Sequence, residues 1–234
     1  MARTLAIYQS NVGDRTGHKS TPFLAHITKR VNDAKDLILG IDNGRFSWLR
    51  NQLTLSFAQG DYRQEISSSE NFKSLAVPHA VYDETVLEDY IAVVDSWDTF
   101  LKDAEWKPQT SAPTSDDYGT PSFCVIEEVV EGGVFKRYLR LDVPTDTAIV
   151  LRVHFYRNLV DLSDSSDTFL GMPANFESAI EEYAVWKMLE YRGHNLTAQQ
   201  IAQNNWETFY NALLVGADSQ HIGSAQLKID TSRL

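Results

Sequence analysis

The chain contains 234 residues, of which 43% are hydrophobic, and its formal net charge is −11. This length is enough for one well-buried core with an inserted lobe, and 11 Phe, 10 Tyr and 5 Trp are typical of a globular protein. No apolar run approaches the roughly 18 residues of a membrane span. The excess of acid argues against a general nucleic-acid binder, because neutralising phosphates requires an excess of Lys and Arg.

Cysteine content indicates the cellular compartment, and the charge distribution indicates the kind of partner. The single cysteine, Cys124, excludes an internal disulfide and favours a reducing compartment. The charge is uneven, because residues 1–35 carry a net +4 while the rest of the chain sums to −15. Such polarity predicts a basic end that docks on an acidic partner, with scattered surface charge as the alternative.

Residues 11–27, NVGDRTGHKSTPFLAHI, follow a short apolar run and superficially match a phosphate-binding P-loop. The match fails at His18, which stands where the motif needs a second glycine so that consecutive amides can surround a phosphate. Nucleotide binding is therefore not expected. The segment is instead predicted to be a loop that feeds a helix. Arg15, His18 and Lys19 make this loop basic, so we expect them to form a docking surface.

Helical periodicity begins at Thr21, which can cap a helix whose first position is Pro22. Apolar residues then recur at intervals of three and four until the Asn43-Gly44 pair ends the pattern. From about residue 50 the period becomes two, and QLTLSFAQGDYRQEIS predicts a hairpin that turns at residues 59–61.

The middle of the chain is rich in strand patterns. SLAVP and DYIAVV are predicted strands, SWDTFLKDAEW is a predicted short helix, and the proline-rich residues 107–121 are a predicted exposed loop. SFCVIEEVV, VFKRYLRLDV and TAIVLRVHFYR are three further predicted strands. The short links between these three favour antiparallel hairpins over parallel crossovers.

Helical periodicity returns near Pro173. PANFESAIEEYAVWKMLEYRG predicts a helix that ends at Gly193. Its second half is apolar on more than one side, so we expect it to pack against several neighbours. The following helix opens with Thr197-Ala198-Gln199-Gln200, a capping-box pattern.

Together these elements predict an α+β protein in which terminal helices form a small helical bundle and an antiparallel β-rich lobe is inserted between them. We expect one domain over residues 1–217, with the helical part at about 21–48 and 172–217 and the lobe at about 49–171. Residues 218–234 have only weak patterning and are predicted to be a C-terminal extension.

The sequence holds none of the common catalytic, nucleotide-binding or metal-binding motifs. His154 and Cys124 lie on predicted strands and are expected to be packed residues rather than a ligand and a nucleophile. Carboxylate groups such as Glu127-Glu128 are expected to be solvated surface. We therefore predict no catalytic residue, no cofactor and no metal, and a structural or binding role.

Spacing and residue class in the second half of the chain resemble those of head-to-tail adaptor (connector) proteins of tailed bacteriophages. The shared elements are a G-x-P strand entry, a strand pair ending near a proline, an L-x-V-x-F-Y strand, a polar D/S linker and a P-x-x-F helix start. In this chain they fall on Gly119 and Pro121, Pro144, Leu151 to Tyr156, Asp161 to Thr168, and Pro173 to Phe176. The amphipathic first helix, RFSWL and the hairpin bearing Tyr62 are similar to the tail-tubular adaptors of short-tailed phages.

The resemblance implies a structural virion protein of the neck, without catalytic residues, that is assembled in the host cytoplasm. It implies a homo-oligomeric ring, usually a dodecamer, that attaches beneath the portal protein, extends the DNA ejection channel and offers a docking surface to the tail or nozzle protein. DNA would be non-specific cargo in an acidic channel that does not grip phosphates, and no membrane would be involved.

A soluble ligand- or carbohydrate-binding β-domain with helical appendages is the alternative. Trp48, Trp97, Trp106 and Trp206 are aromatic residues of the kind that line sugar sites. Trp97 and Trp206, however, lie in predicted helical stripes, which favours core packing.

Overall fold

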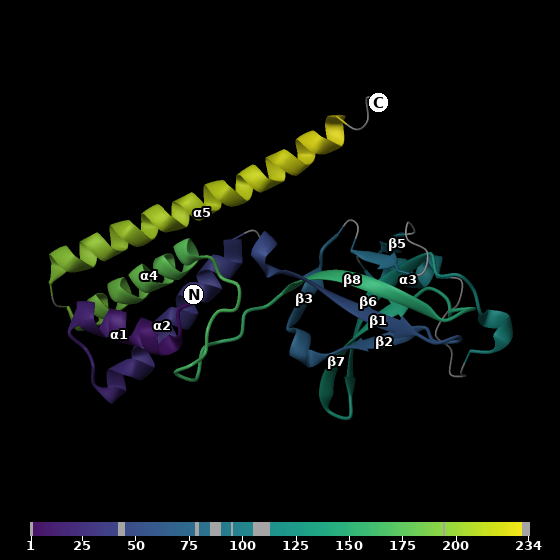
Figure 1. The fold of residues 1–234 in the computed structure, drawn as a ribbon, viewed down its shortest axis with the longest axis horizontal. Helices are drawn as coiled ribbons and strands as arrows, with labels where there is room; N and C mark the ends of the chain where they lie inside the picture. Colours follow the sequence, from purple (N-terminus) through teal and green to yellow (C-terminus); the bar gives the residue numbers. More distant parts are fainter. Residues whose placement is uncertain are drawn as a thin grey trace. The chain divides into compact units, whose positions relative to one another are not determined.

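The chain folds into two compact units that differ in secondary structure (Figure 1). The computed structural model describes residues 2–41, 45–77, 80–84, 90–94, 96–104, 113–193 and 195–230. Residues 1–49 and 159–234 form a helical unit, and residues 50–158 form a β unit. The protein is therefore α+β, as the sequence predicts.

Helices from both ends of the chain make up the helical unit. They are α1 (Leu5–Thr16), α2 (Thr21–Gly40), α4 (Ala174–Arg192) and α5 (Leu196–Asp230). The three predicted helices in this unit correspond to α2, α4 and α5. Helix α5 continues to Asp230, so most of the predicted C-terminal extension, residues 218–234, is a continuation of this helix.

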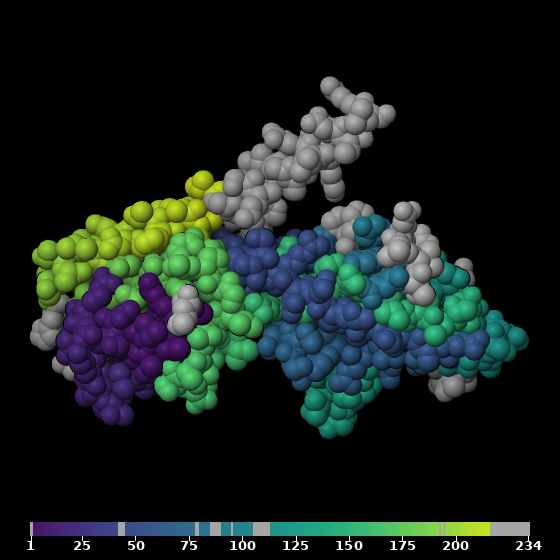
Figure 2. Space-filling model, in the orientation of Figure 1, coloured from purple at the N-terminus to yellow at the C-terminus, as the bar shows by residue number. Residues whose placement is uncertain are grey.

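Helix α1 occupies residues 11–16 of the loop that the sequence predicts over residues 11–20, and only residues 17–20 form a turn. Thr4 caps the helix by accepting a hydrogen bond from the Ile7 amide, and Tyr8 and Val12 are fully buried on one face. Figure 2 shows this N-terminal segment as part of the helical unit's packed surface. The loop prediction is wrong for this stretch because few of its residues are apolar, so the three- and four-residue spacing that indicates a helix is weak in the sequence.

Gly13 stands where a P-loop would have its first glycine. It lies inside α1, where a Cβ would come within 2.9 Å of the His18 carbonyl oxygen. Gly17 ends the helix in a left-handed conformation with φ of 73°, and its N–H donates to the Gly13 carbonyl. Glycine is thus required by the close approach of the turn to the helix, and not by a phosphate loop.

The starts of α2 and α5 differ slightly from the predicted caps. Ser20 is the N-cap residue of α2, so Thr21 is its first helical residue. In α5 the Asn195 side chain accepts a hydrogen bond from the Ala198 amide at 3.1 Å, and thus takes the capping role predicted for Thr197.

Helix α4 packs against α1, α2 and α5, which confirms the prediction from its apolar second half. Its buried residues occupy several sides: Ala179, Ile180, Tyr183, Ala184, Val185, Met188 and Leu189. Residues 159–171 belong to the helical unit, although the sequence places them in the lobe. Backbone and side-chain hydrogen bonds hold them there, including Leu5 N–H to the Asp167 carbonyl at 2.9 Å and Asn32 Nδ2 to the Leu162 carbonyl at 3.1 Å.

The β unit contains one mixed sheet with the strand order β1-β8-β4-β5-β6-β7-β2, and β3 pairs with β8. The strands are β1 (Arg50–Phe57), β2 (Arg63–Ile66), β3 (Phe72–Leu75), β4 (Val81–Asp83), β5 (Tyr90–Val93), β6 (Phe123–Glu131), β7 (Val134–Leu141) and β8 (Ile149–Arg157). Strands β1 and β2, at the two ends of this order, contact each other, so the sheet curls toward a barrel.

Two predicted hairpins do not form. The connection from β1 to β2 and the connection from β7 to β8 instead lie together and form one corner of the sheet. The sequence predicts pairing of β1 with β2 and of β7 with β8, but β1 pairs with β8 and β2 pairs with β7. Both connections turn at the same place and are hydrogen-bonded to each other. The Gly60 N–H donates to the Thr145 carbonyl at 2.8 Å, and the Thr145 N–H donates to the Asp61 carbonyl at 3.0 Å. Because the two turns are bonded to each other, β2 does not fold back onto β1 and β8 does not fold back onto β7. Each of these strands instead pairs with a strand of the other connection.

One pair of strands is parallel, so the prediction of a purely antiparallel lobe is wrong. Strand β5 pairs with β6 in parallel, with Ala92 opposite Phe123. The chain between them includes α3 (Trp97–Asp103), whose Phe100 is fully buried in a small cluster with Val125. A connection of this length and helical content is what a parallel crossover requires. The predicted pairing of β6 with β7 is confirmed.

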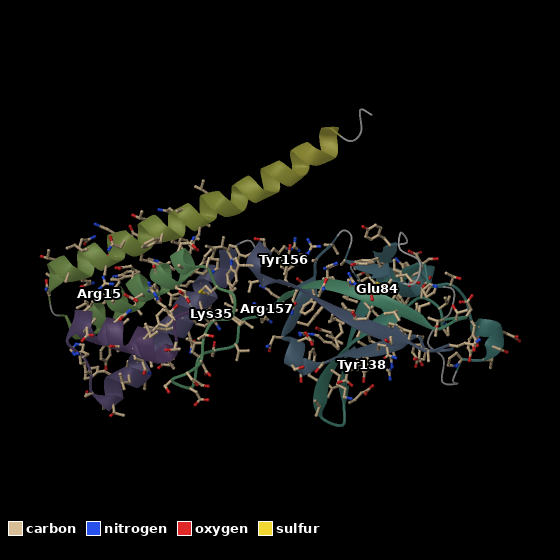
Figure 3. All side chains as sticks on the ribbon, viewed as in Figure 1. Arg15, Lys35, Glu84, Tyr138, Tyr156 and Arg157 are labelled. Atoms are coloured by element: carbon tan, nitrogen blue, oxygen red, sulfur yellow. The ribbon has the colours of Figure 1, made fainter. Side chains whose placement is uncertain are left out.

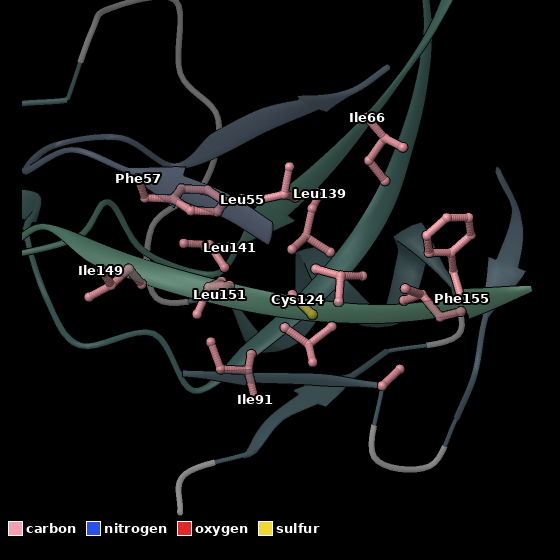
Figure 4. Packing of buried hydrophobic residues seen from close by; sticks show 14 of the residues in the cluster. Leu55, Phe57, Ile66, Ile91, Cys124, Leu139, Leu141, Ile149, Leu151 and Phe155 are labelled. Atoms are coloured by element: carbon pink, nitrogen blue, oxygen red, sulfur yellow. The ribbon is translucent and has the colours of Figure 1, made fainter. Parts of the chain in front are cut away.

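The main core of the β unit lies between its curled strands (Figure 4). Strand β8 alternates buried and half-buried residues along its length, which matches its predicted period of two. Its inward residues Leu151, Val153 and Phe155 are fully buried, and Cys124 packs in the same cluster.

Replacing Gly60 by Ala should destabilise the β unit. Gly60 has a φ of 87°, which an alanine rarely adopts, and a Cβ there would lie 2.6 Å from the Tyr118 hydroxyl oxygen. The variant would therefore have a strained backbone at residue 60 and would have to displace the Tyr118 side chain. We expect a loss of about 1–2 kcal/mol in the free energy of unfolding, measured by urea titration. Gly40→Ala is the control, since Gly40 lies at a helix end with open space beside it. Equal free energies of unfolding for the two variants would show that an alanine at position 60 is not strained.

Candidate functional site

The three predicted docking residues lie at the end of α1, where Figure 3 labels Arg15, and in the turn that follows it. Arg15 is in the last turn of α1, and His18 and Lys19 are in the connection to α2. The Lys19 ammonium contacts the Asp14 carboxylate, and the His18 ring stacks on Phe23 at a centroid distance of 4.7 Å. The segment is therefore a defined turn with a basic residue at its tip.

Arg15 makes its strongest contacts inside the helical unit. Its guanidinium donates two hydrogen bonds to the Glu182 carboxylate, at 2.8 and 2.9 Å, and lies 3.6 Å from Glu181. The hydrogen bonds that Arg15 donates to Glu182 and the charges of Glu182 and Glu181 raise the pKa of Arg15. Bidentate pairing of this kind fixes both position and orientation. Arg15 thus fastens α1 to α4, and Lys19 is the more accessible cation.

Other basic residues near the N-terminus also pair with acidic residues of the same unit. The Arg3 guanidinium binds Glu181 at 2.7 Å, and its backbone N–H donates to the Glu177 carboxylate at 2.7 Å. The Lys35 ammonium, on α2, contacts Asp161 and Asp36. The charge difference between the first 35 residues and the rest of the chain is therefore used largely for internal contacts, a pairing that the sequence alone could not show.

The former P-loop candidate has no cradle for a phosphate. The amides of Gly17 and His18 both donate to the Gly13 carbonyl, and the His18 bond measures 2.9 Å. Amides that complete a helix end cannot simultaneously surround an anion. The local backbone therefore agrees with the sequence argument based on His18.

Cys124 and His154 are packed as predicted. Cys124 is fully buried, and burial followed by the charge of Asp142 raises the pKa of its thiol far above the ordinary range. His154 stacks on Tyr82 at 5.5 Å between ring centroids, and burial lowers its pKa. Among the described residues, no three His, Cys, Asp or Glu side chains come together in a way that could hold a metal ion.

The tryptophans proposed for a sugar site lie in separate places. Trp48 packs against Phe176, and Trp206 packs against Tyr183, each in the helical unit. Trp97 stacks on Phe100 in the β unit. Trp106 lies outside the described residues. The described tryptophans therefore do not line one common site.

One face of β6, β7 and β2 carries a ladder of arginine and aromatic side chains. The guanidinium of Arg140 lies 4.9 Å from the Tyr62 ring centroid and 5.4 Å from that of Trp97. Arg63 lies 4.6 Å from the Tyr138 ring, and the Tyr138 hydroxyl donates to Glu131 at 2.8 Å. The alternation of Lys136, Tyr138 and Arg140 along β7 is a signal for this ladder that the sequence analysis did not use. Its charges are matched internally, which makes it a structural element.

Helix α5 presents an unusual solvent-facing surface. Of the residues from 196 to 215, only Glu207 is charged, although 23% of the chain is charged. We call its exposed uncharged residues the α5 outer face: Leu196, Thr197, Gln200, Ile201, Asn204, Asn205, Thr208, Asn211, Ala212, Leu214 and Val215. The opposite side, with Ala202, Trp206 and Leu213, is buried. None of the described helices is apolar over the length that a bilayer crossing requires.

Three residues of the α5 outer face recur at intervals of seven. Ile201, Thr208 and Val215 are all β-branched and all exposed, with 55% exposure for Ile201 and 69% for Val215. A seven-residue repeat of such residues is typical of a helix that packs along a second helix. Depletion of charge is likewise typical of the centre of a protein interface.

The β unit also contains a cavity of about 530 Å³ beside β4, β5 and β8. Its lining residues include the aromatic Tyr90, the acidic Asp83 and Asp146, and the hydroxyl-bearing Thr120 and Ser122. The size is in the range of small-molecule pockets.

Comparison of the sequence with protein-family models and with curated proteins gave no match. Function is therefore inferred from the residues described above. Of these, the basic turn at Lys19 and the α5 outer face are the surfaces whose chemistry favours a macromolecular partner.

Proposed function

We propose that this protein is a structural virion component, a head-to-tail connector whose copies form a ring beneath the portal. In this proposal the terminal helices act as a small helical bundle that builds the ring, and the ring extends the DNA channel and provides the docking surface for the tail or nozzle protein. The partners are the portal, the tail component and further copies of the chain, most simply twelve in total. The protein acts in the virion neck and assembles in the host cytoplasm.

The α5 outer face is the observation that carries the proposal. A helix face that remains in water ordinarily displays charged residues, often in stabilising pairs one turn apart. This face carries no charge and exposes Ile201, Leu214 and Val215, and Glu207 is the one charged residue of the stretch 196–215. Burial against a protein removes the cost of exposing these apolar side chains, whereas a monomer retains it.

The length of α5 supports the same interpretation. Its 35 residues span about 52 Å, and the 19 residues of α4 span about 28 Å, at the usual rise of 1.5 Å per residue. Helix α4 can therefore accompany only part of α5. Long helices in proteins depend on packing rather than on intrinsic propensity, so a second helix is expected to cover the rest.

A ring places two demands on each subunit. Rotational symmetry without a twofold axis between neighbours requires two different, complementary patches on every copy. The α5 outer face supplies one, and the second would lie elsewhere on the neighbouring subunit. A net charge of −11 is compatible with a channel wall that lets DNA pass without binding its phosphates.

The basic turn between α1 and α2 is the proposed contact to the portal. Arg15 contributes by holding α1 on α4, while the exposed Lys19 ammonium would exchange its contact with the Asp14 carboxylate for an acidic surface of the portal. His18, stacked on Phe23, shapes the turn. This division of roles refines the expectation that all three residues dock in the same way.

Binding of a small ligand such as a carbohydrate is the second candidate function. The cavity of about 530 Å³ favours it, because an aromatic ring, carboxylates and hydroxyls are the groups that recognise sugars. It would leave the protein monomeric and would raise its melting temperature when ligand is added.

Mixing the purified protein with purified portal rings should give a stable complex. We expect electron micrographs to show an added layer with rotational symmetry and native mass spectrometry to give one copy number. A protein that stays monomeric and unattached beside intact portal rings would refute the connector function, and a thermal shift with sugars would then support the second candidate.

Val215→Lys should prevent ring assembly. A lysine placed in a charge-poor interface must be desolvated without a partner, which costs several kcal/mol at each repeated contact. Val130→Lys is the matched control, because Val130 in the β unit is also 69% exposed. Analytical ultracentrifugation in the presence of the portal should show rings for the control and not for Val215→Lys, with equal melting temperatures for the two monomers. If both variants formed rings, the α5 outer face would not be part of the interface between subunits.

Lys19→Glu should weaken attachment to the portal without preventing folding. The change reverses a charge at the turn while leaving the pairing of Arg15 with Glu182 in place. Lys29→Glu, an equal change at an exposed site on α2, is the control. Binding measured at increasing salt should be weaker and less salt-dependent for Lys19→Glu alone. Identical binding of both variants would leave the turn without a docking role.

A further inference from the structure

The hairpin formed by β6 and β7 extends beyond its neighbouring strands (Figures 1 and 2). Pairing of β7 with β2 ends where Arg137 lies opposite Ile66, whereas pairing of β7 with β6 continues to Val134. Among the described residues, Val134, Phe135 and Lys136 therefore pair on one side only. The chain leaves β2 through Ser67 and enters a 3-10 helix at residues 68–70, away from the line of the strand.

The free side of this hairpin segment carries an accessible backbone donor and acceptor. The Leu141 N–H donates to the Tyr62 carbonyl at 2.8 Å on the β2 side, and the Asp142 N–H donates to the Phe123 carbonyl on the β6 side. Amides alternate in direction along a regular strand. Counting back through the unbroken register of β7, the N–H and C=O of Phe135 point toward the β2 side, beyond the last residue of β2.

A groove of about 240 Å³ lies beside this edge. The apolar side chains of Ile66, Phe72, Val134 and Phe135 line it together with the polar residues Ser67, Ser68, Asn71 and Asn158. Its volume is below the range of about 300–1,000 Å³ for small-molecule sites, and it adjoins an open strand edge. Those two properties suit one side chain of an extended polypeptide better than a compact ligand.

The charges around the groove indicate what kind of segment fits. Lys136 pairs with Glu65 at 2.9 Å, and the Arg137 guanidinium donates to Glu128 at 2.7 Å and to the Phe72 carbonyl at 2.6 Å. The cations of the lining are thus already matched, so a charged side chain entering the groove would lose water without gaining a new counter-charge. Electrostatic complementarity therefore favours an uncharged segment with one apolar side chain.

We propose that this edge binds an extended, uncharged segment of another protein, which adds a strand antiparallel to β7 and in line with β2. The Phe135 N–H and C=O would bond to the added strand, and an apolar side chain of that strand would fill the groove. Addition of a strand to an open sheet edge is an established mode of peptide recognition. The exposure of Phe135, at 54%, is then explained by an absent partner.

A selection of random linear peptides against the full-length protein tests the proposal. The strongest binder is synthesised, and its affinity is measured by fluorescence anisotropy for the wild type and three variants. Phe135→Pro removes the outward N–H and should weaken binding at least about tenfold, the effect of losing roughly 1.4 kcal/mol. Phe135→Leu keeps the N–H and an apolar side chain, and should bind within about threefold of wild type.

Val130→Pro is the matched control. Val130 lies directly opposite Phe135 in the same hairpin, so its N–H points to the other edge, where β5 pairs only with Phe123 and Cys124 among the described residues. This variant should bind the peptide as tightly as the wild type. Hydrogen exchange on the wild type supplies a readout that needs no variant, since bound peptide should slow exchange at Phe135 and not at Val130.

Three results would overturn the proposal. One is that the selection yields no peptide that protects the Phe135 amide. Another is an equal loss of affinity in Phe135→Pro and Val130→Pro. The third is concentration-dependent self-association of the protein without peptide that Phe135→Pro abolishes, because the edge would then belong to a second copy of the chain. None of these measurements depends on ring formation, so they are independent of the connector function.

Discussion

Thr145 is the residue around which the β unit is connected. It is fully buried, its N–H and C=O bond to the backbone of residues 60–61, and its hydroxyl donates to the Ala58 carbonyl at 2.7 Å. Buried polar groups must find partners, and here each partner is a turn of the opposite connection. The chain therefore enters the corner along β1 and along β7 and leaves it along β2 and β8, with β1 paired to β8 and β2 paired to β7. The pairing of β1 with β8 and of β2 with β7 follows from this constraint.

Unequal strand lengths around that corner create the open edge. Strand β1 matches β8 residue for residue, but β2 has four residues against the eight of β7. The surplus of β7 can pair only with β6, so the hairpin projects with one edge open beside a groove. The α5 outer face has a different origin, because its residues lie between 196 and 215 and owe their character to the near absence of charge in that stretch.

Sequence periodicity was sufficient for most elements but not for their partners. Strand β8 and helices α2 and α4 carry clear periods of two or 3.6, because one face of each is buried. Turn residues such as Gly60 mark a reversal of the chain, yet a hairpin and a shared corner use the same residues. For the candidate site, Arg15 was identifiable as basic, but its partner Glu182 is 167 residues away. Long-range pairing of this kind leaves no local pattern.

The helical unit is built from the two ends of the chain, and this has a consequence for synthesis. Helices α1 and α2 leave the ribosome before α4, against which both pack, and the whole of residues 50–158 is translated in between. At about 5–20 residues per second, the roughly 150 residues from the end of α2 to the end of α4 take about 8–30 s to synthesise, and until then the apolar faces of α1 and α2 lack this partner. During that interval the β unit can complete its own core. The nascent chain therefore carries an unpaired helical hairpin, a natural substrate for chaperones, until its last third emerges.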